Sequence, residues 1–195
     1  KMCIRCANSG NRCRLSLVVG FSIILVLVNL FYPTSILMAD WSTAINLSNS
    51  WIDSGEPALA MESNGRLHAV WEEGNYIYYS SKLPGGDWST PTVVPGCPQN
   101  SHEPSLAADT SNALHLVWWS SDLVGSYGVL YAFKPSGGSW SHLEQVAWHP
   151  SGILGTDVAV DNSGAVHAVW SYPPYGLHDV FHARRAVGGS WSSLT

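Results

Sequence analysis

The stretch NGRLHAVWEE, from Asn64 to Glu73, recurs in the chain and decides the fold. Its near copies are SNALHLVWWS, from Ser111 to Ser120, and SGAVHAVWSY, from Ser163 to Tyr172. In each copy a histidine stands among apolar residues and a tryptophan follows three positions later. A repeated histidine beside a repeated tryptophan is either a repeated site or a repeated piece of core.

Constant spacings connect each copy to two further landmarks. The tryptophan of a Trp-Ser pair stands 16 residues before the start of PALAME, PSLAAD or TDVAVD (41 to 57, 88 to 104, 140 to 156). The tryptophan of the histidine motif follows that start by 14 residues in every case (71, 118, 170). Only the leg to the next Trp-Ser pair varies, at 17, 22 and 21 residues. Two constant legs and one variable leg indicate a repeat array.

Each unit is predicted to hold four short strands, which we name A to D. Strand A begins at PALAM or its counterparts, strand B is LHAVW, strand C is YIYYSS, and strand D begins at the Trp-Ser pair. These segments are rich in Val, Leu, Tyr and Trp and are bounded by Gly, Pro, Asn and Ser. Asn64-Gly65 marks a tight A–B turn and Gly85-Gly86 a tight C–D turn. Repeated four-stranded antiparallel units of about 50 residues predict an all-β fold, the β-propeller.

The predicted propeller covers residues 40–195. Its units span about 41–87, 88–139 and 140–190, and a further strand begins at 191. Because propellers close with roughly four to eight blades, the three units are expected to be part of a larger closed ring. Assembly from several short chains is the alternative.

Residues 1–39 have the pattern of a targeting segment. Four basic residues precede the uncharged apolar run from Leu15 to Phe31, and the small residue Ala39 precedes Asp40. This pattern predicts a secretory signal peptide cut after Ala39, or an uncleaved N-terminal membrane anchor. In both cases the rest of the chain is expected to be secreted or exposed at the cell surface, touching the membrane only through this segment.

The charge of the predicted exported part excludes one class of partner. From Asp40 onward there are fourteen acidic residues and five basic ones. Nucleic acid is therefore not an expected partner, because phosphate binding requires clustered Lys and Arg. Cys97 is the single cysteine of this part, so no internal disulfide supports the fold.

The order EPALAMESNGRLHAVW, IYYSS and GGDWSTP resembles the BNR, or Asp-box, repeats of sialidase-like β-propellers in secreted bacterial proteins. The resemblance extends from Trp41 to Thr195. The family turn is Ser-x-Asp-x-Gly-x-x-Trp; Ser81, Gly85 and Trp88 keep this spacing, but Leu83 stands in the Asp place. The other two units keep only the glycine and the tryptophan, at Gly137 and Trp140 and at Gly188 and Trp191. The Asp boxes are degenerate.

This resemblance implies a sialidase only if the family's catalytic residues are present. Such enzymes share three arginines that bind the substrate carboxylate, a tyrosine nucleophile with a glutamate partner, and an aspartate acid/base. After Asp40 the arginines are Arg66, Arg184 and Arg185, and the last two are consecutive in a strand and face opposite ways. No catalytic residue can be transferred. Enzyme activity is left open, with a non-enzyme favoured; an enzyme would be an exo-sialidase-like glycoside hydrolase.

The repeated histidines His68, His115 and His167 are expected to be structural. Equivalent residues of successive blades stay apart around the ring and cannot converge on one metal ion. Each histidine is expected to bond a backbone carbonyl or an adjoining blade. The tryptophans that end strand B and begin strand D are expected to pack between blades.

Function is expected where the repeat departs from itself, in the B–C connection. In propellers of this connectivity the B–C and D–A loops share one face, where binding sites usually lie. Candidate ligand-binding residues are Trp119, Asp122, Tyr127, Tyr172, Tyr175 and His178 from B–C loops and Asp53, Glu56, His102 and Glu103 from D–A loops. Aromatic rings beside carboxylates suit sugars, since rings stack on pyranose faces and acids accept from hydroxyls. The alternative is that the aromatic residues Trp119, Tyr172 and Tyr175 cap the blade ends.

These observations lead to a functional hypothesis. We expect a non-catalytic module that binds a glycan or an extracellular protein at the B–C/D–A face. The alternatives are a sialidase-type hydrolase whose catalytic residues lie mostly in further blades, and a structural or adhesive repeat region of a surface protein. No cofactor is implied, although Glu56, Glu103 and Asp157 could form an acidic ring that binds Ca²⁺.

Overall fold

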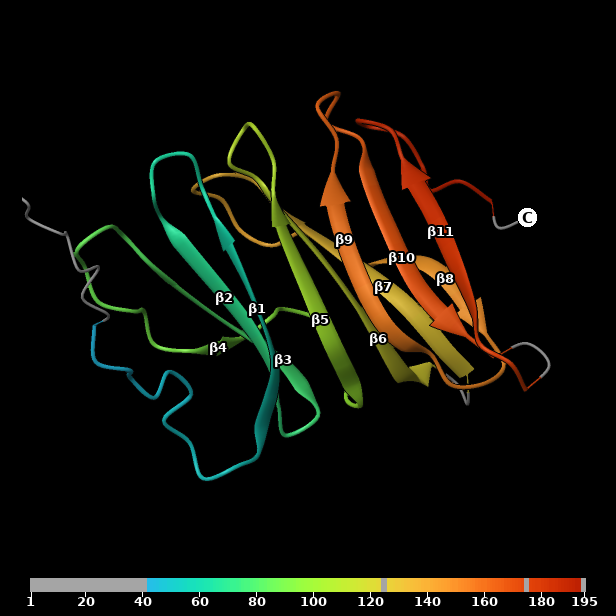
Figure 1. Ribbon diagram of the computed structural model, residues 1–195, viewed down its shortest axis with the longest axis horizontal. Coiled ribbons are helices and arrows are strands. Elements are labelled where there is room, and N and C mark those ends of the chain that lie inside the picture. Colours follow the sequence, from blue (N-terminus) through green and yellow to red (C-terminus); the bar gives the residue numbers. More distant parts are fainter. Residues whose placement is uncertain (1–41, 124–125, 174–175, 194–195) are drawn as a thin grey trace, which may run out of the picture. The chain divides into compact units, whose positions relative to one another are not determined.

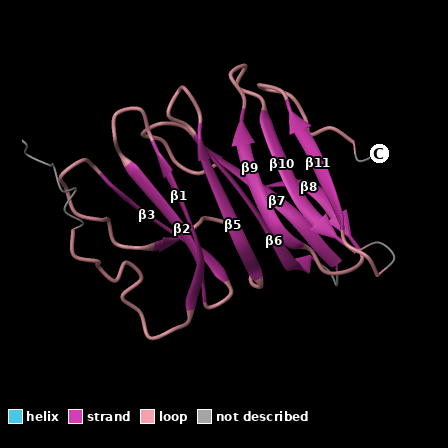
Figure 2. Ribbon diagram, viewed as in Figure 1, coloured by secondary structure: helices cyan, strands magenta, loops and turns pink. Residues whose placement is uncertain are grey.

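The computed structural model describes residues 42–123, 126–173 and 176–193. Within these ranges the fold is all-β: Figure 2 shows strands and loops, and no helix there could cross a membrane. The chain divides into two compact units, 1–43 and 44–195. Of the first unit only Ser42 and Thr43 are described, and both are exposed. The predicted signal or anchor at 1–39 lies outside the described residues.

The strands form three antiparallel sheets, each with its first strand at one edge (Figure 1). The first sheet is β1 (Ser54–Met61), β2 (Leu67–Glu73), β3 (Tyr76–Lys82) and β4 (Thr92–Val93). The second is β5 (Ser101–Ala108), β6 (Leu114–Leu123), β7 (Ser126–Lys134) and β8 (Glu144–His149). The third is β9 (Leu154–Val160), β10 (Val166–Tyr172) and β11 (Asp179–Arg185). Strands A, B and C of each unit are thus present where the sequence predicts them.

The three first strands lie side by side. β5 contacts β1 on one side and β9 on the other (Figure 1). The core lies between successive sheets, and β6 contributes to both halves of it. Leu116 and Trp118 pack with Val70 of the first sheet, whereas Val117 packs with Ala168 of the third. Because successive side chains of a strand point to opposite faces, β6 is apolar at every one of these positions.

Two of the tryptophans of the Trp-Ser pairs, Trp140 and Trp191, join neighbouring sheets. The Trp140 ring meets Tyr79 of the first sheet edge-on, with centroids 5.5 Å apart and an interplanar angle of 89°. Trp191 meets Tyr131 of the second sheet at 5.2 Å and 77°. Edge-to-face geometry is favoured for aromatic pairs. The predicted packing between units is confirmed for Trp140 and Trp191, whereas Trp88 contacts Lys82 of its own sheet.

The fourth strands begin later than predicted. β4 starts at Thr92 and β8 at Glu144, beyond the Trp-Ser pairs at 88 and 140. In the third unit the described residues form only an isolated bridge between Arg185 and Trp191.

The serine of each Trp-Ser pair explains this delay. The Ser89 N–H donates to the Ser81 carbonyl at 2.8 Å, and its hydroxyl accepts the Ser81 N–H at 3.1 Å. The same two bonds join Ser141 to Phe133 and Ser192 to Arg184. A serine side chain therefore replaces a backbone acceptor at the C–D turn, and the regular ladder resumes only after it.

Candidate functional site

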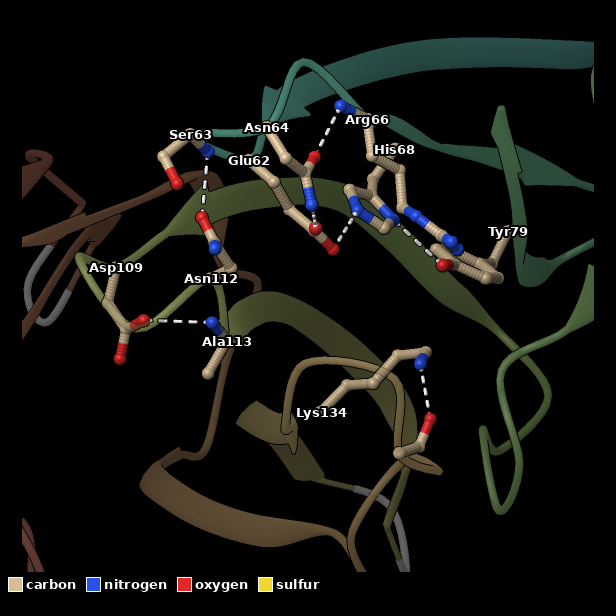
Figure 3. Close-up of polar contacts among 11 residues, drawn as sticks. Glu62, Ser63, Asn64, Arg66, His68, Tyr79, Asp109, Asn112, Ala113 and Lys134 are labelled. Atoms are coloured by element: carbon tan, nitrogen blue, oxygen red, sulfur yellow. Dashed lines mark hydrogen bonds and ion pairs between the residues drawn. The ribbon is translucent and has the colours of Figure 1, made fainter. Parts of the chain in front are cut away.

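Each repeated histidine is held by two side chains of its own sheet. His68 Nε2 lies 2.9 Å from a Glu62 carboxylate oxygen, and His68 Nδ1 lies 2.8 Å from the Tyr79 hydroxyl (Figure 3). The acid belongs to the A–B turn and the tyrosine to β3. The equivalent groups are Asp109, His115 and Tyr131 (3.4 and 2.9 Å) and Asp161, His167 and His182 (3.1 and 3.0 Å). We call these three groups the acid–His triads.

The prediction that the repeated histidines bond a backbone carbonyl or an adjoining blade is wrong. A carboxylate and a hydroxyl of the same sheet, not a backbone carbonyl or an adjoining blade, satisfy both ring nitrogens of His68 and His115. The acid can do so because it closes the A–B turn directly beside strand B, six positions before the histidine. With both nitrogens occupied, these two histidines act as structural groups.

Burial fixes the protonation of these groups. It lowers the pKa of His68 and His115, and the neighbouring carboxylates only partly oppose the shift. Burial also raises the pKa of the Tyr131 hydroxyl to about 12. Near neutral pH the Tyr131 hydroxyl therefore donates to His115 Nδ1, and the Nε2–H of His115 donates to Asp109.

The predicted ligand-binding residues that the structure describes lie at the other end of the sheets, where strands A begin and strands B end. Most of them are in strands rather than in loops. Glu56 belongs to β1, and His102 and Glu103 belong to β5. Trp119 and Asp122 belong to β6, Tyr127 to β7 and Tyr172 to β10. The prediction of loops is wrong for these residues, because the strands extend further toward this end than their apolar segments indicate.

A β-bulge explains why the first strands continue through an apparent turn. Glu56, Glu103 and Gly155 occupy the same place in their units and have φ angles of 46°, 51° and 57°. The strand register shifts beside each of them. Glycine adopts this left-handed backbone freely, whereas another residue in such a region costs on the order of 1–3 kcal/mol. Two sheets nevertheless carry glutamate where the third carries glycine. Such strained residues cluster at functional sites.

The three bulges line one pocket of about 320 Å³, which we call the inner-strand pocket. Its lining is Glu56, Pro57, Glu103, Pro104, Gly155 and Thr156. Contacts between the second and third sheets fix one side of it: the Glu103 carboxylate accepts the Gly155 N–H, and the Glu103 carbonyl accepts the Thr156 hydroxyl. Glu56 is exposed, and its carboxylate makes no hydrogen bond within the described residues. Glu56 is therefore the acid of this pocket that offers both carboxylate oxygens to a ligand.

The acidic ring expected at this end does not form in the described residues. Asp157 does not line the inner-strand pocket; it accepts the Ser105 hydroxyl of the second sheet at 2.7 Å. Across the described part of the chain, no group of three His, Cys, Asp or Glu residues is arranged to hold a metal ion.

His102, Trp119 and Tyr127 form an aromatic cluster at this end of the second sheet. The ring centroids of His102 and Trp119 lie 4.4 Å apart, and those of Trp119 and Tyr127 lie 6.1 Å apart. His102 Nδ1 is 2.9 Å from the Glu72 carboxylate of the first sheet. The indole N–H of Trp119 is buried and has no hydrogen-bond partner among the described residues. Three of the predicted residues are thus brought together.

The remaining predicted residues are not part of this cluster. Tyr172 is 8% exposed and packs against His149 and Phe181, which fits the blade-capping alternative. Asp53 and His178 are exposed, and Tyr175 lies outside the described residues.

The three arginines that the structure describes lie at the opposite end, beside the A–B turns. Arg66 is in the first A–B turn. Arg184 pairs across the strands with His167, next to the third A–B turn. The Arg185 side chain reaches the second sheet, where its Nη2 lies 3.0 Å from Glu144. Within the described residues, no arginine lines the inner-strand pocket.

Comparison with known proteins finds a similar fold among solved structures only. No protein-family model matches the chain, and no curated protein matches it either. Among solved structures, the Hadza microbial sialidase Hz136 is similar, with a TM-score of 0.58 at 12% sequence identity. The match covers 71% of this chain and 36% of that one, so the chain spans about a third of the sialidase it matches. The chain has a sialidase-like β-fold.

Proposed function

We propose that this chain is part of a sialidase-like β-propeller that binds a glycan at the inner-strand pocket and carries out no chemistry there. The observation that carries the proposal is the left-handed Glu56 beside the equivalent Gly155. A glutamate at a position where glycine suffices costs stability, and Glu56 makes no hydrogen bond in the described residues that offsets this cost. A ligand that binds the Glu56 carboxylate would explain why a glutamate stands at this strained position.

The chemistry of this end of the sheets suits a sugar. Exposed carboxylates accept hydrogen bonds from hydroxyls, and Glu56 offers both of its oxygens. The ring of Trp119 and the imidazole of His102 lie in the same part of the second sheet and provide flat faces. A sialic acid carboxylate would instead need arginine, and the described arginines lie at the other end. A neutral glycan therefore fits better than a sialoside.

The proposal includes two further points: the propeller has more blades than the three sheets, and the protein is exported. The glycine and tryptophan spacing of the degenerate Asp boxes supports a propeller with more blades than the three sheets, and exposed apolar side chains such as Met61 and Val180 suit packing against further sheets. The basic start and apolar run of residues 1–39 support export.

A glycan-binding measurement on the full chain tests this proposal. Binding of neutral glycans on an array, confirmed by calorimetry, should weaken at least roughly tenfold in Glu56→Gln, a loss of about 1.4 kcal/mol. The control is Asp87→Asn, an equal change of charge at an exposed residue in the C–D turn. Hydrolysis of a fluorogenic sialoside would contradict the proposal and favour the sialidase-type hydrolase. Glycan binding that is equally strong in Glu56→Gln would show that the inner-strand pocket is not the binding site.

A further inference from the structure

A second cavity, of about 380 Å³, lies between the second and third sheets at the A–B-turn end. We call it the inter-sheet cavity. Its lining includes Phe133, Ser141, Glu144, Val166, Arg185 and Val187. The volume falls within the range of about 300–1,000 Å³ that is usual for ligand sites. The Glu144 side chain is 38% exposed, so the cavity opens to solvent.

Arg185 and Glu144 hold the hydrogen-bonding capacity that remains in this cavity. Arg185 Nε is buried and has no hydrogen-bond partner among the described residues, although Nη2 of the same side chain bonds Glu144. Glu144 uses one carboxylate oxygen for this bond, and its second oxygen bonds none of the described residues. The Nε atom itself is closed to solvent, but the Arg185 side chain is 21% exposed, so its open part and the second Glu144 oxygen are what a ligand can reach.

The other polar groups at the cavity are already occupied. The Ser141 hydroxyl accepts the Phe133 N–H and donates to the His142 carbonyl. Asp109 accepts two backbone N–H groups of its turn and faces His115. These groups shape the cavity without adding to its recognition chemistry.

The equivalent position between the first and second sheets lacks this pair. Lys134 and Thr92 stand where the third and second sheets carry Arg185 and Glu144, since each is displaced equally from its Trp-Ser pair. The Lys134 ammonium donates to the Gly138 carbonyl of its own turn (Figure 3). The units of the repeat therefore differ at Arg185 and Glu144, the two residues whose side chains keep unused hydrogen-bonding groups.

We propose that the inter-sheet cavity is a second binding site, for an uncharged sugar ring. A sugar hydroxyl both donates and accepts, so one hydroxyl can accept from Arg185 while a neighbouring one donates to Glu144. Phe133, Val166 and Val187 provide the apolar wall for the C–H face of the ring. The two carboxylates, Asp109 and Glu144, outnumber the single arginine, so an acidic sugar is disfavoured. The site is independent of the inner-strand pocket, from which it is separated by the length of the strands.

Chemical-shift mapping on the full chain tests this site with methyl β-D-galactopyranoside and methyl α-D-mannopyranoside as neutral probes and N-acetylneuraminic acid as the acidic one. At least one neutral probe at about 20 mM should shift the amides of Val187 and Gly188, with the millimolar affinity usual for one sugar ring. The variants are Arg185→Lys and Glu144→Thr, which introduce the residues that the preceding unit of the repeat carries. Each should weaken binding roughly tenfold, while a thermal melt reports that the fold is kept.

The Glu56→Gln variant distinguishes this site from the inner-strand pocket. The neutral probe should shift the Gly188 amide as much in this variant as in the wild type. Any of three results overturns the proposal: no shift at Val187 and Gly188 with either neutral probe, undiminished binding in both variants, or preference for N-acetylneuraminic acid. Shifts confined to Gly155 and Thr156 would also overturn it, while supporting the inner-strand pocket.

Discussion

The carboxylate of Glu62 and the imidazole of His68 lie 2.9 Å apart, and their side chains are 4% and 3% exposed. The same pair in the third sheet, Asp161 and His167, is 38% and 30% exposed. The chemistry is alike, but the second sheet covers the first pair, whereas no described sheet covers the third. The acid–His triads thus provide one hydrogen-bonded unit at two levels of burial.

Tyr131→Phe should destabilise the fold more than a change at the exposed triad. It removes the hydroxyl that donates to the buried His115 Nδ1, which should lower the free energy of unfolding by about 1–3 kcal/mol. His182→Ala removes the corresponding partner of the half-exposed His167, where water can substitute, and should cost less than about 0.5 kcal/mol. Urea denaturation measures both. Equal costs would mean that burial does not govern the triads.

Stability should fall as the pH drops below neutrality. Because burial lowers the pKa of His68 and His115, the unfolded chain takes up their protons near its ordinary pKa of about 6.5, while the folded chain resists. The unfolded state then binds more protons, so the free energy of unfolding decreases from about pH 7 toward about pH 5 and is level above it as far as these groups are concerned. Urea titrations across this range test the slope. His115→Gln should reduce it, and an unchanged slope in that variant would contradict this origin.

The tryptophans of the Trp-Ser pairs should differ in their contributions. Trp140 packs edge-on against Tyr79 of the neighbouring sheet, and Trp140→Ala should cost about 3 kcal/mol. Trp88 has the same place in the first unit but lies beneath the Lys82 ammonium, at 5.9 Å. An exposed cation–π contact is worth about 0.5–1 kcal/mol, so Trp88→Ala should cost little more than that. Thermal and urea unfolding of the two variants compares them, and similar losses would argue against an inter-sheet role for Trp140.

The sequence predicts strands A, B and C well because their apolar residues and turn residues agree in three copies. It does not reveal how far the first strands continue. Glu56-Pro57 has the composition of a turn, and glutamate gives no signal of a left-handed bulge, since it usually avoids positive φ. The inner-strand pocket therefore could not be predicted as such, although Glu56 and Glu103 could be named. The partner of the histidine could have been found, because an acid stands six residues before it in all three copies.

Glu56→Gly separates function from stability at the inner-strand pocket. Glycine tolerates the φ of 46° that glutamate adopts there, and the third sheet already has Gly155 at this place. The variant should therefore be as stable as the wild type or more stable by up to about 1 kcal/mol, while a glycan held by the Glu56 carboxylate should bind more weakly. Glu103→Gly is the matched change in the second sheet; it should lose stability, because the Glu103 carboxylate accepts the Gly155 N–H. Urea denaturation and calorimetry on the same samples report both quantities. A Glu56→Gly variant that loses stability and keeps its binding would show that the glutamate serves the fold, and a variant that gains stability and loses binding would show that the strain is kept for the ligand.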